Sequence, residues 1–197
     1  GQARAKARDY AGYSYGKVLD GGMELSAKAF WEEAQRSDRR YKDLKGNSFD
    51  MNGASAIDPR SLNLYARKDG LTLRLILDEY SFREGDWSGD LDVVRTAAPG
   101  ADDERISFNS TLAEAKYDWK LSDALRLEPR LNAVRSEPWR ENDTYDVFEK
   151  TTSRVTGKLT AFYEPPGKVS LVAGGEYYHD SAELARKTLN FSGKYYA

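Results

Sequence analysis

The sequence predicts an all-β protein, an antiparallel up-and-down meander of about nine strands, on the strength of two observations. First, apolar and polar residues alternate along almost the whole 197-residue chain. An alternation with a period of two gathers the apolar side chains on one face of a strand, whereas it would scatter them around a helix. Second, the alternating runs are joined by turn sequences rich in Gly, Asp and Pro.

The clearest run is LTLRLILDEY, residues 71–80, in which a leucine occupies every second position from Leu71 to Leu77. Arg74 and Asp78 lie among the residues between the leucines. Similar runs recur from end to end, which favours one sheet and a single domain over 1–197. In chain order, the predicted strands are 3–19, 22–33, 60–68, 71–80, 112–121, 124–133, 154–163, 168–178 and 186–196.

Short and long connections alternate between the predicted strands. The short ones carry turn residues, at Asp20-Gly21-Gly22, Asp69-Gly70, Ser122-Asp123 and Pro165-Pro166-Gly167. The long ones are polar and cover 36–59, 84–103, 138–148 and 179–186. Outer-membrane barrels have this pattern, with short periplasmic turns and longer extracellular loops. We therefore expect a transmembrane β-barrel or part of one, although nine strands would place the chain ends at opposite rims.

The two faces of the predicted sheet differ in polarity. The residues expected to face lipid are Leu71, Leu73, Leu75, Leu77, Leu125, Leu127 and Leu131. The charges expected to face a lumen are Arg74, Asp78, Glu114, Lys116, Asp118, Lys120, Arg126, Glu128 and Arg130. Aromatic side chains gather toward strand ends on the apolar face, as at a membrane interface, at Trp31, Tyr117, Trp119, Tyr163, Tyr177 and Tyr195. The alternative is a soluble sandwich or barrel in which the same leucines form a core.

The charges also predict how the strands on either side of Ser122-Asp123 pair. If both strands keep their apolar residues on one face, the loop between them can hold three or five residues. Three residues would place Lys120 opposite Arg126, and five would place Lys120 opposite Glu128. Opposite charges that face each other across a strand pair stabilise a sheet by roughly 0.2–1 kcal/mol, and like charges destabilise it similarly. We therefore expect the five-residue loop, with Asp118 opposite Arg130.

Composition and motifs narrow the function classes. A formal net charge of −2 does not suggest a nucleic-acid partner, and the absence of cysteine excludes disulfides and thiolate metal sites. No nucleophile elbow, phosphate-binding loop or zinc-protease motif occurs, so we predict neither an enzyme nor a cofactor. The single histidine, His179, stands near Asp180 and Glu183. One histidine beside two acidic residues is more typical of a solvated loop than of a metal site, so no metal is expected.

The segment from Asp38 to Tyr80 resembles an early extracellular loop and its flanking strands in the barrel of a TonB-dependent outer-membrane receptor. The resemblance rests on the elements RRY, SFDM and NGASAIDPR, followed by the leucine-alternating hairpin. The preceding SYGKVLDGGMELSAKAFWEE is similar to the strand–turn–strand before that loop. Unlike the family pattern of a plug domain and a 22-stranded barrel, the sequence shows about nine strands, nothing like a plug, and a last strand ending in Tyr195-Tyr196-Ala197.

The resemblance implies uptake of a ligand across the bacterial outer membrane, with the lipid bilayer as one partner and the TonB system, reached through a plug, as another. It implies a bulky nutrient such as an iron chelate, and nothing in the residues selects one. The long 36–59 connection is the best candidate for ligand recognition because it would lie on the extracellular rim; its candidate residues are Arg39, Arg40, Tyr41 and Phe49. The alternatives are a plug-less structural or assembly barrel of the outer membrane, and a soluble β-barrel that binds a small molecule.

Overall fold

The computed structural model describes residues 8–36, 39–42, 46, 48–50, 55–83, 105–142, 146–167 and 169–188. The regular secondary structure in these ranges is entirely β-strand, which confirms the all-β prediction. The strands are β1 (Asp9–Val18), β2 (Glu24–Gln35), β3 (Arg40–Lys42), β4 (Ser48–Asp50), β5 (Ala56–Lys68), β6 (Leu71–Arg83), β7 (Arg105–Tyr117), β8 (Trp119–Lys120), β9 (Leu125–Asn142), β10 (Asp146–Tyr163) and β11 (Leu171–Thr188).

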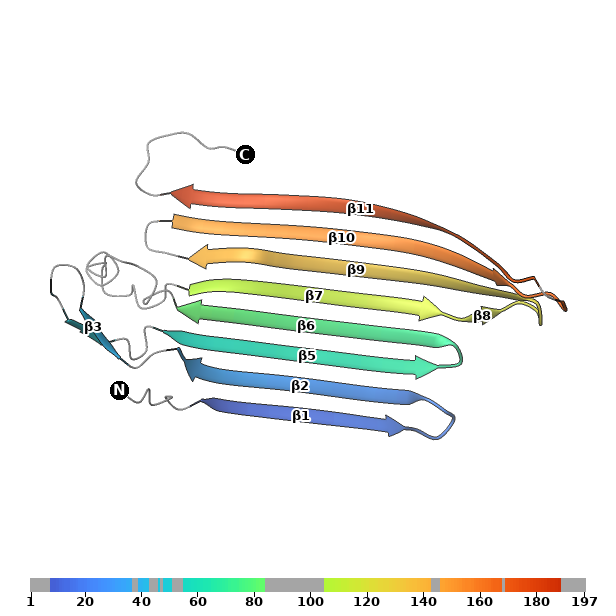
Figure 1. The fold of residues 1–197 in the computed structure, drawn as a ribbon, viewed down its shortest axis with the longest axis horizontal. Coiled ribbons are helices and arrows are strands. Elements are labelled where there is room, and N and C mark those ends of the chain that lie inside the picture. The colour runs from blue at the N-terminus through green and yellow to red at the C-terminus, as the bar shows by residue number, and fades with distance from the viewer. Residues whose placement is uncertain are drawn as a thin grey trace.

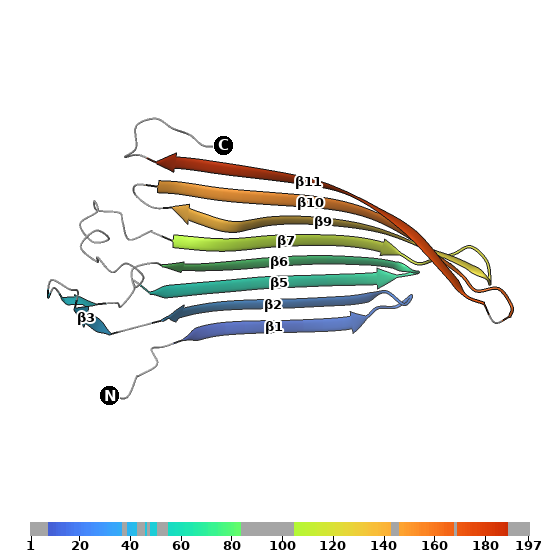
Figure 2. The same cartoon turned by 45° about the horizontal axis from the view of Figure 1, so that its top comes forward.

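Nine of these strands form one antiparallel sheet in the order β1-β2-β5-β6-β7-β9-β10-β11, with β8 paired to β9 as a continuation of β7. Each long strand thus lies beside its neighbours in sequence, as a meander requires (Figure 1). The strands β3 and β4 make a separate hairpin. The strands β1 and β11 are the two edges of the open sheet in both views (Figures 1 and 2). Closure into a barrel therefore stays a prediction.

Two of the four predicted long connections were wrong, and a third, 84–103, lies outside the described residues. Strand β9 runs to Asn142 and β10 begins at Asp146, so most of the expected 138–148 connection is strand. The expected 179–186 connection lies within β11. Both strands continue beyond their apolar stretch, where the alternation that revealed them is broken or changes phase. On β11, Ser181 and Glu183 share a face with the leucines, and Ala182 and Leu184 lie on the opposite face.

The predicted number of strands in the sheet was right, but the nine strands are not the nine predicted segments. The predicted strand 112–121 is divided into β7 and β8, and most of the predicted strand 186–196, with Tyr195, lies outside the described residues. The sheet path contains eight long strands, an even number. As a result β1 begins and β11 ends at the same rim, the one that also carries the β3–β4 hairpin (Figure 1). The expectation that the chain ends lie at opposite rims concerns 1–7 and 189–197, which lie outside the described residues.

The turn between β5 and β6 is fixed by backbone geometry. Asp69 and Gly70 both have positive φ, 47° and 85°, as a two-residue hairpin turn of the type favoured by Asp-Gly requires. The Gly70 carbonyl accepts a hydrogen bond of 3.0 Å from the Asp118 N–H. A Cβ on Gly70 would lie 2.7 Å from the Asp118 carbonyl oxygen. This turn therefore needs a glycine both for its φ and for its contact with the end of β7.

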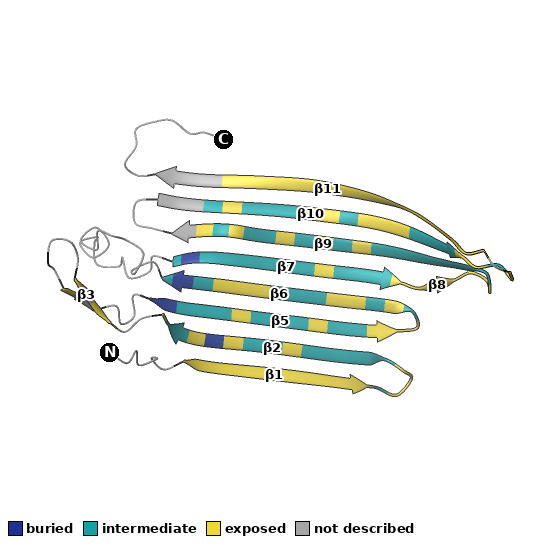
Figure 3. Ribbon diagram, viewed as in Figure 1, coloured by how far each residue is buried: buried dark blue, intermediate teal, exposed yellow. Residues whose placement is uncertain are grey.

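Few side chains are buried in this sheet. The buried apolar residues in the described ranges are Ala56, Phe82 and Ile106, near the rim with the long connections (Figure 3). The leucine face is largely accessible, with Leu131 55% and Leu73 44% exposed. The sheet alone therefore lacks a hydrophobic core comparable to that of a soluble domain of this length.

We predict that Gly70→Ala lowers the free energy of unfolding by about 1–3 kcal/mol, because alanine is strained at this φ and its Cβ collides with Asp118. Urea unfolding of the protein in detergent micelles, followed by circular dichroism, measures the change. Gly12→Ala is the matched control, since a Cβ there meets no atom within 4 Å and its φ is not positive. Equal effects of the two substitutions would contradict this account of the turn.

Candidate functional site

The register of the strands assigns side chains to two faces, because residues directly opposite one another in an antiparallel pair share a face. The leucines predicted to face lipid all lie on one face, here called the apolar face. One row across this face contains Leu25, Ala66, Leu73, Ala115, Leu131, Gly157 and Tyr177. The next row contains Tyr15, Ala27, Leu64, Leu75, Ala113, Ala133, Val155 and His179.

The apolar residues on this face form a band whose limits move along the strands from β1 to β11. At the rim with the long connections, Asp9 and Glu33 are the first polar residues on β1 and β2, and they lie opposite each other. Toward β11, this limit shifts stepwise toward the turn rim. It shifts by one row on β5 and β6, by a second row on β7 to β10, and by a third on β11. The residues that mark these steps are Arg60 and Glu79, then Thr111, Arg135 and Ser153, and finally His179.

The limit at the turn rim moves in the same direction. On β1 the band stops at Lys17, which lies opposite Leu25, and on β5 it stops one row lower at Lys68. On β9 and β10 it extends two rows further still, to Leu125 and its partner Tyr163. The apolar band is therefore bounded by two roughly parallel lines that cross the strands obliquely.

The slant of this band corresponds to a definite angle. A shift of three rows along the strands is about 20 Å, and the seven steps between the eight strands span about 34 Å, which gives a slant of about 30°. Strands of outer-membrane barrels tilt by about 35–45° from the membrane normal. An apolar slab crossed by strands of comparable tilt would produce a band of this kind.

Aromatic side chains lie near both limits of the band, although Tyr177 is inside β11 and not toward a strand end as the sequence predicted. Trp31 lies next to Glu33 at the limit near the long connections, and Tyr177 lies next to His179 at the same limit on β11. Tyr117, Trp119 and Tyr163 lie toward the turn rim, and all five side chains are exposed. Rings with one polar edge suit a boundary between an apolar and an aqueous layer.

The nine predicted lumen-facing charges all lie on the opposite face, here called the charged face, but the predicted register was wrong. Lys120 lies opposite Arg126, and Lys116 lies opposite Arg130, so the loop holds three residues. The turn explains this choice. The Ser122 hydroxyl accepts hydrogen bonds from the N–H groups of Ala124 and Leu125, at 3.2 and 3.0 Å. These bonds stabilise the shorter loop.

Opposite charges still meet in this register, but along diagonals. Side-chain distances are 3.7 Å between Glu114 and Arg130, 3.6 Å between Lys116 and Glu128, and 3.5 Å between Asp118 and Arg126. Each pair is displaced by two residues from the directly opposite position, a distance that long side chains can bridge. The prediction failed because it considered only directly opposite pairs.

Glu128 is the centre of this network. Its carboxylate lies 3.1 Å from Arg130, 3.6 Å from Lys116 and 3.9 Å from Arg126, and its side chain is 17% exposed. At the turn, Lys120 pairs instead with Asp123 at 2.8 Å, and this hydrogen bond lowers the pKa of the Asp123 carboxyl. The charges on this part of the face therefore largely compensate one another.

A cluster of four aromatic rings lies on the charged face near the rim with the long connections, and sequence reasoning missed it. Tyr80, Phe82, Phe108 and Trp139 have neighbouring ring centroids 5.5–6.2 Å apart. The guanidinium of Arg36 lies 4.8 Å from the centre of the Phe82 ring. The available signal was that aromatic residues replace polar ones at the charged-face positions where β6 ends and β7 begins.

The structure keeps the predicted recognition residues together on one hairpin. Arg40 begins β3, Tyr41 lies opposite Phe49 of β4, and Arg39 precedes the hairpin. The side chains of Arg39 and Arg40 are exposed. The hairpin lies at the rim of the sheet, apart from its long strands (Figure 1).

The acidic and histidine residues of β11 are not brought together. His179 and Glu183 lie on the apolar face, whereas Asp180 lies on the charged face and pairs with Arg154 at 2.6 Å. No group of three metal-ligating side chains occurs among the residues that the structure describes. The expectation that these residues lie in a loop was wrong, because they belong to a strand.

No family model, no curated protein and no solved structure matches this chain. In the described ranges, no helix is long and apolar enough to cross a membrane. The geometry of the described residues leaves three candidate functional surfaces: the slanted apolar band, the charged face and the rim that carries the hairpin.

We predict that Glu128→Gln lowers the free energy of unfolding by about 1–2 kcal/mol, because three cations lose their shared counter-charge. Chemical unfolding in micelles at low salt measures the loss, and added salt should reduce it by screening the cations. Glu164→Gln is the control, an exposed carboxylate without an ion pair in the described part of the chain. A loss for Glu128→Gln no larger than that for the control would show that the network contributes little.

Proposed function

We propose that this chain forms all or part of the wall of a transmembrane β-barrel in the bacterial outer membrane, of the TonB-dependent receptor type, and serves ligand uptake. The observation that carries the proposal is the slanted apolar band. A soluble sheet has no reason to limit its apolar residues by two parallel oblique lines, whereas a bilayer imposes such limits on tilted strands.

The exposure of the band supports the same proposal. Exposed apolar patches larger than a few hundred Å² are rare in soluble monomers, because each Å² left in water costs about 25 cal/mol. The described part of the chain provides no second layer over the leucines. Lipid acyl chains would cover this face without any further protein.

The two polar regions fit distinct tasks in such a wall. The charged face would line an aqueous lumen, where paired charges remain hydrated. The β3–β4 hairpin and the aromatic cluster at the same rim would face the outside and contact the arriving ligand, for which an iron chelate or another bulky nutrient is our proposal. Coupling to the TonB system would require a plug domain.

A plug-less structural or assembly barrel is the second candidate, and the mutual compensation of the charges around Glu128 favours it. A lumen wall that neutralises its own charges has no need of a charged occupant. The distinguishing observation is the complete gene sequence, since only the receptor requires a plug domain. A soluble barrel that binds a small molecule inside is a third candidate. The exposed leucines argue against it, because a soluble barrel would bury them in a core.

The first test is refolding from urea with and without detergent micelles, followed by circular dichroism and by heat-modifiable migration on a gel. We expect strand content and heat-modifiable migration to appear only with micelles, because the apolar band then finds an apolar phase. Folding as a monomer in plain buffer would mean that the leucines form a core, and the uptake proposal would be abandoned.

A second test uses depth in the bilayer. Leu75→Arg, near the middle of the band, should lower the free energy of unfolding in lipid bilayers by about 2–4 kcal/mol, and Leu71→Arg, near its limit, by about 0–1 kcal/mol. The control is Ser61→Arg on the charged face, where the new cation lies opposite Asp78 and should cost little. Equal losses at the two leucine positions would argue against a bilayer around this face.

A further inference from the structure

Two lysines mark the limit of the apolar band at the turn rim on β1 and β5. Lys17 lies opposite Leu25, which lies opposite Ala66, and Lys68 follows Ala66 by two residues on the same face. The two lysines are therefore separated by one intervening strand and offset by two residues along it, about 12 Å apart at the backbone. Both side chains are exposed, and neither ammonium forms an ion pair within the described residues.

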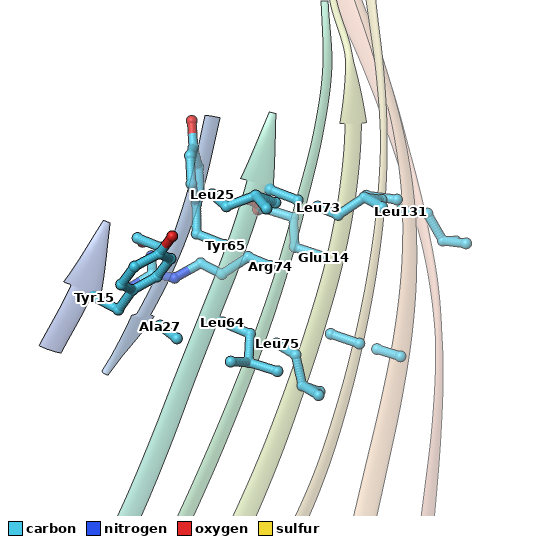
Figure 4. Close-up of a pocket in the computed structure, with 15 residues that line it drawn as sticks. Tyr15, Leu25, Ala27, Leu64, Tyr65, Leu73, Arg74, Leu75, Glu114 and Leu131 are labelled. Atoms are coloured by element: carbon cyan, nitrogen blue, oxygen red, sulfur yellow. The ribbon is translucent and has the colours of Figure 1, made fainter. Parts of the chain in front are cut away.

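Directly above these lysines, the apolar face is hollowed. The hollow has a volume of about 610 Å³, within the range of small-molecule sites. Leu25, Leu73 and Leu131 lie in one row along it, Leu64 and Leu75 lie in a second row, and Tyr15 stands at its β1 end (Figure 4). Its depth comes from alanines set among these leucines, at Ala27, Ala66, Ala113, Ala115 and Ala133.

We propose that this part of the apolar face binds one anionic phospholipid, with its phosphate between Lys17 and Lys68 and an acyl chain in the hollow. Long lysine side chains on an apolar surface extend their ammonium groups toward the headgroup layer, so both cations can reach one phosphate. The hollow begins at Leu25 and Ala66, the residues that lie beside the two lysines, and an acyl chain attached to that phosphate would enter it there. The proposal rests on the proposed membrane function and adds a lipid class and a site.

The test is electron paramagnetic resonance of spin-labelled lipids, with the full chain refolded into phosphatidylcholine bilayers. The spectra give the association of labelled phosphatidylglycerol with the protein, relative to labelled phosphatidylcholine. We expect preference for phosphatidylglycerol, reduced about five-fold by Lys17→Gln and again by adding Lys68→Gln, as expected for the attraction of one lysine to anionic lipid. Ala115→Leu, which fills the floor of the hollow, should reduce the immobilised fraction of an acyl-chain label.

Lys158→Gln is the matched control, because it removes the same charge from the charged face, where Lys158 lies opposite Glu176. An equal loss of preference in Lys158→Gln would show that net charge alone attracts the lipid, and it would overturn the proposed site. Insertion with no preference for phosphatidylglycerol would also overturn it, while the membrane function would stand. Failure of the unaltered chain to insert, judged by heat-modifiable migration, would overturn both proposals.

Discussion

The antiparallel ladder is the constraint on which every other feature of this protein depends. Because directly opposite residues share a face, the register between two strands determines both the face and the depth of each side chain. A change of one residue in any pairing would move leucines to the charged face and charges among the leucines. The apolar band, the charge network and the aromatic cluster all depend on this regular antiparallel pairing, which continues from β1 to β11.

Local turn chemistry sets that register more firmly than the charges do. The hydroxyl of Ser122 and the positive φ values of Asp69 and Gly70 define two turns of fixed length. The charged side chains then adjust, since lysine, arginine and glutamate are long enough to lean toward a diagonal partner. In this sheet the backbone selects the pairing, and the electrostatic contacts follow from it.

The sequence was sufficient for the strand class, the two faces and the positions of the short turns, because these follow from a period of two and from turn residues. It was insufficient where the alternation changes phase, as in β11 beyond His179, where Ser181 and Glu183 lie on the apolar face. The Glu128 network and the aromatic cluster around Phe82 could not be predicted from the sequence either. Both depend on side chains from strands whose relative register only the folded sheet reveals.

The oblique limits of the apolar band also bear on how such a wall can grow. Its limits advance by slightly less than one residue per strand, and this stagger per strand sets the inclination of the strands independently of their number. Adding a hairpin at either edge would keep the inclination and the height of the wall while increasing its circumference. Two strands are the smallest such addition, because a pair returns the chain to the rim it left. A sheet with this stagger can therefore be lengthened by duplication of hairpins, and small and large barrels can share the same wall.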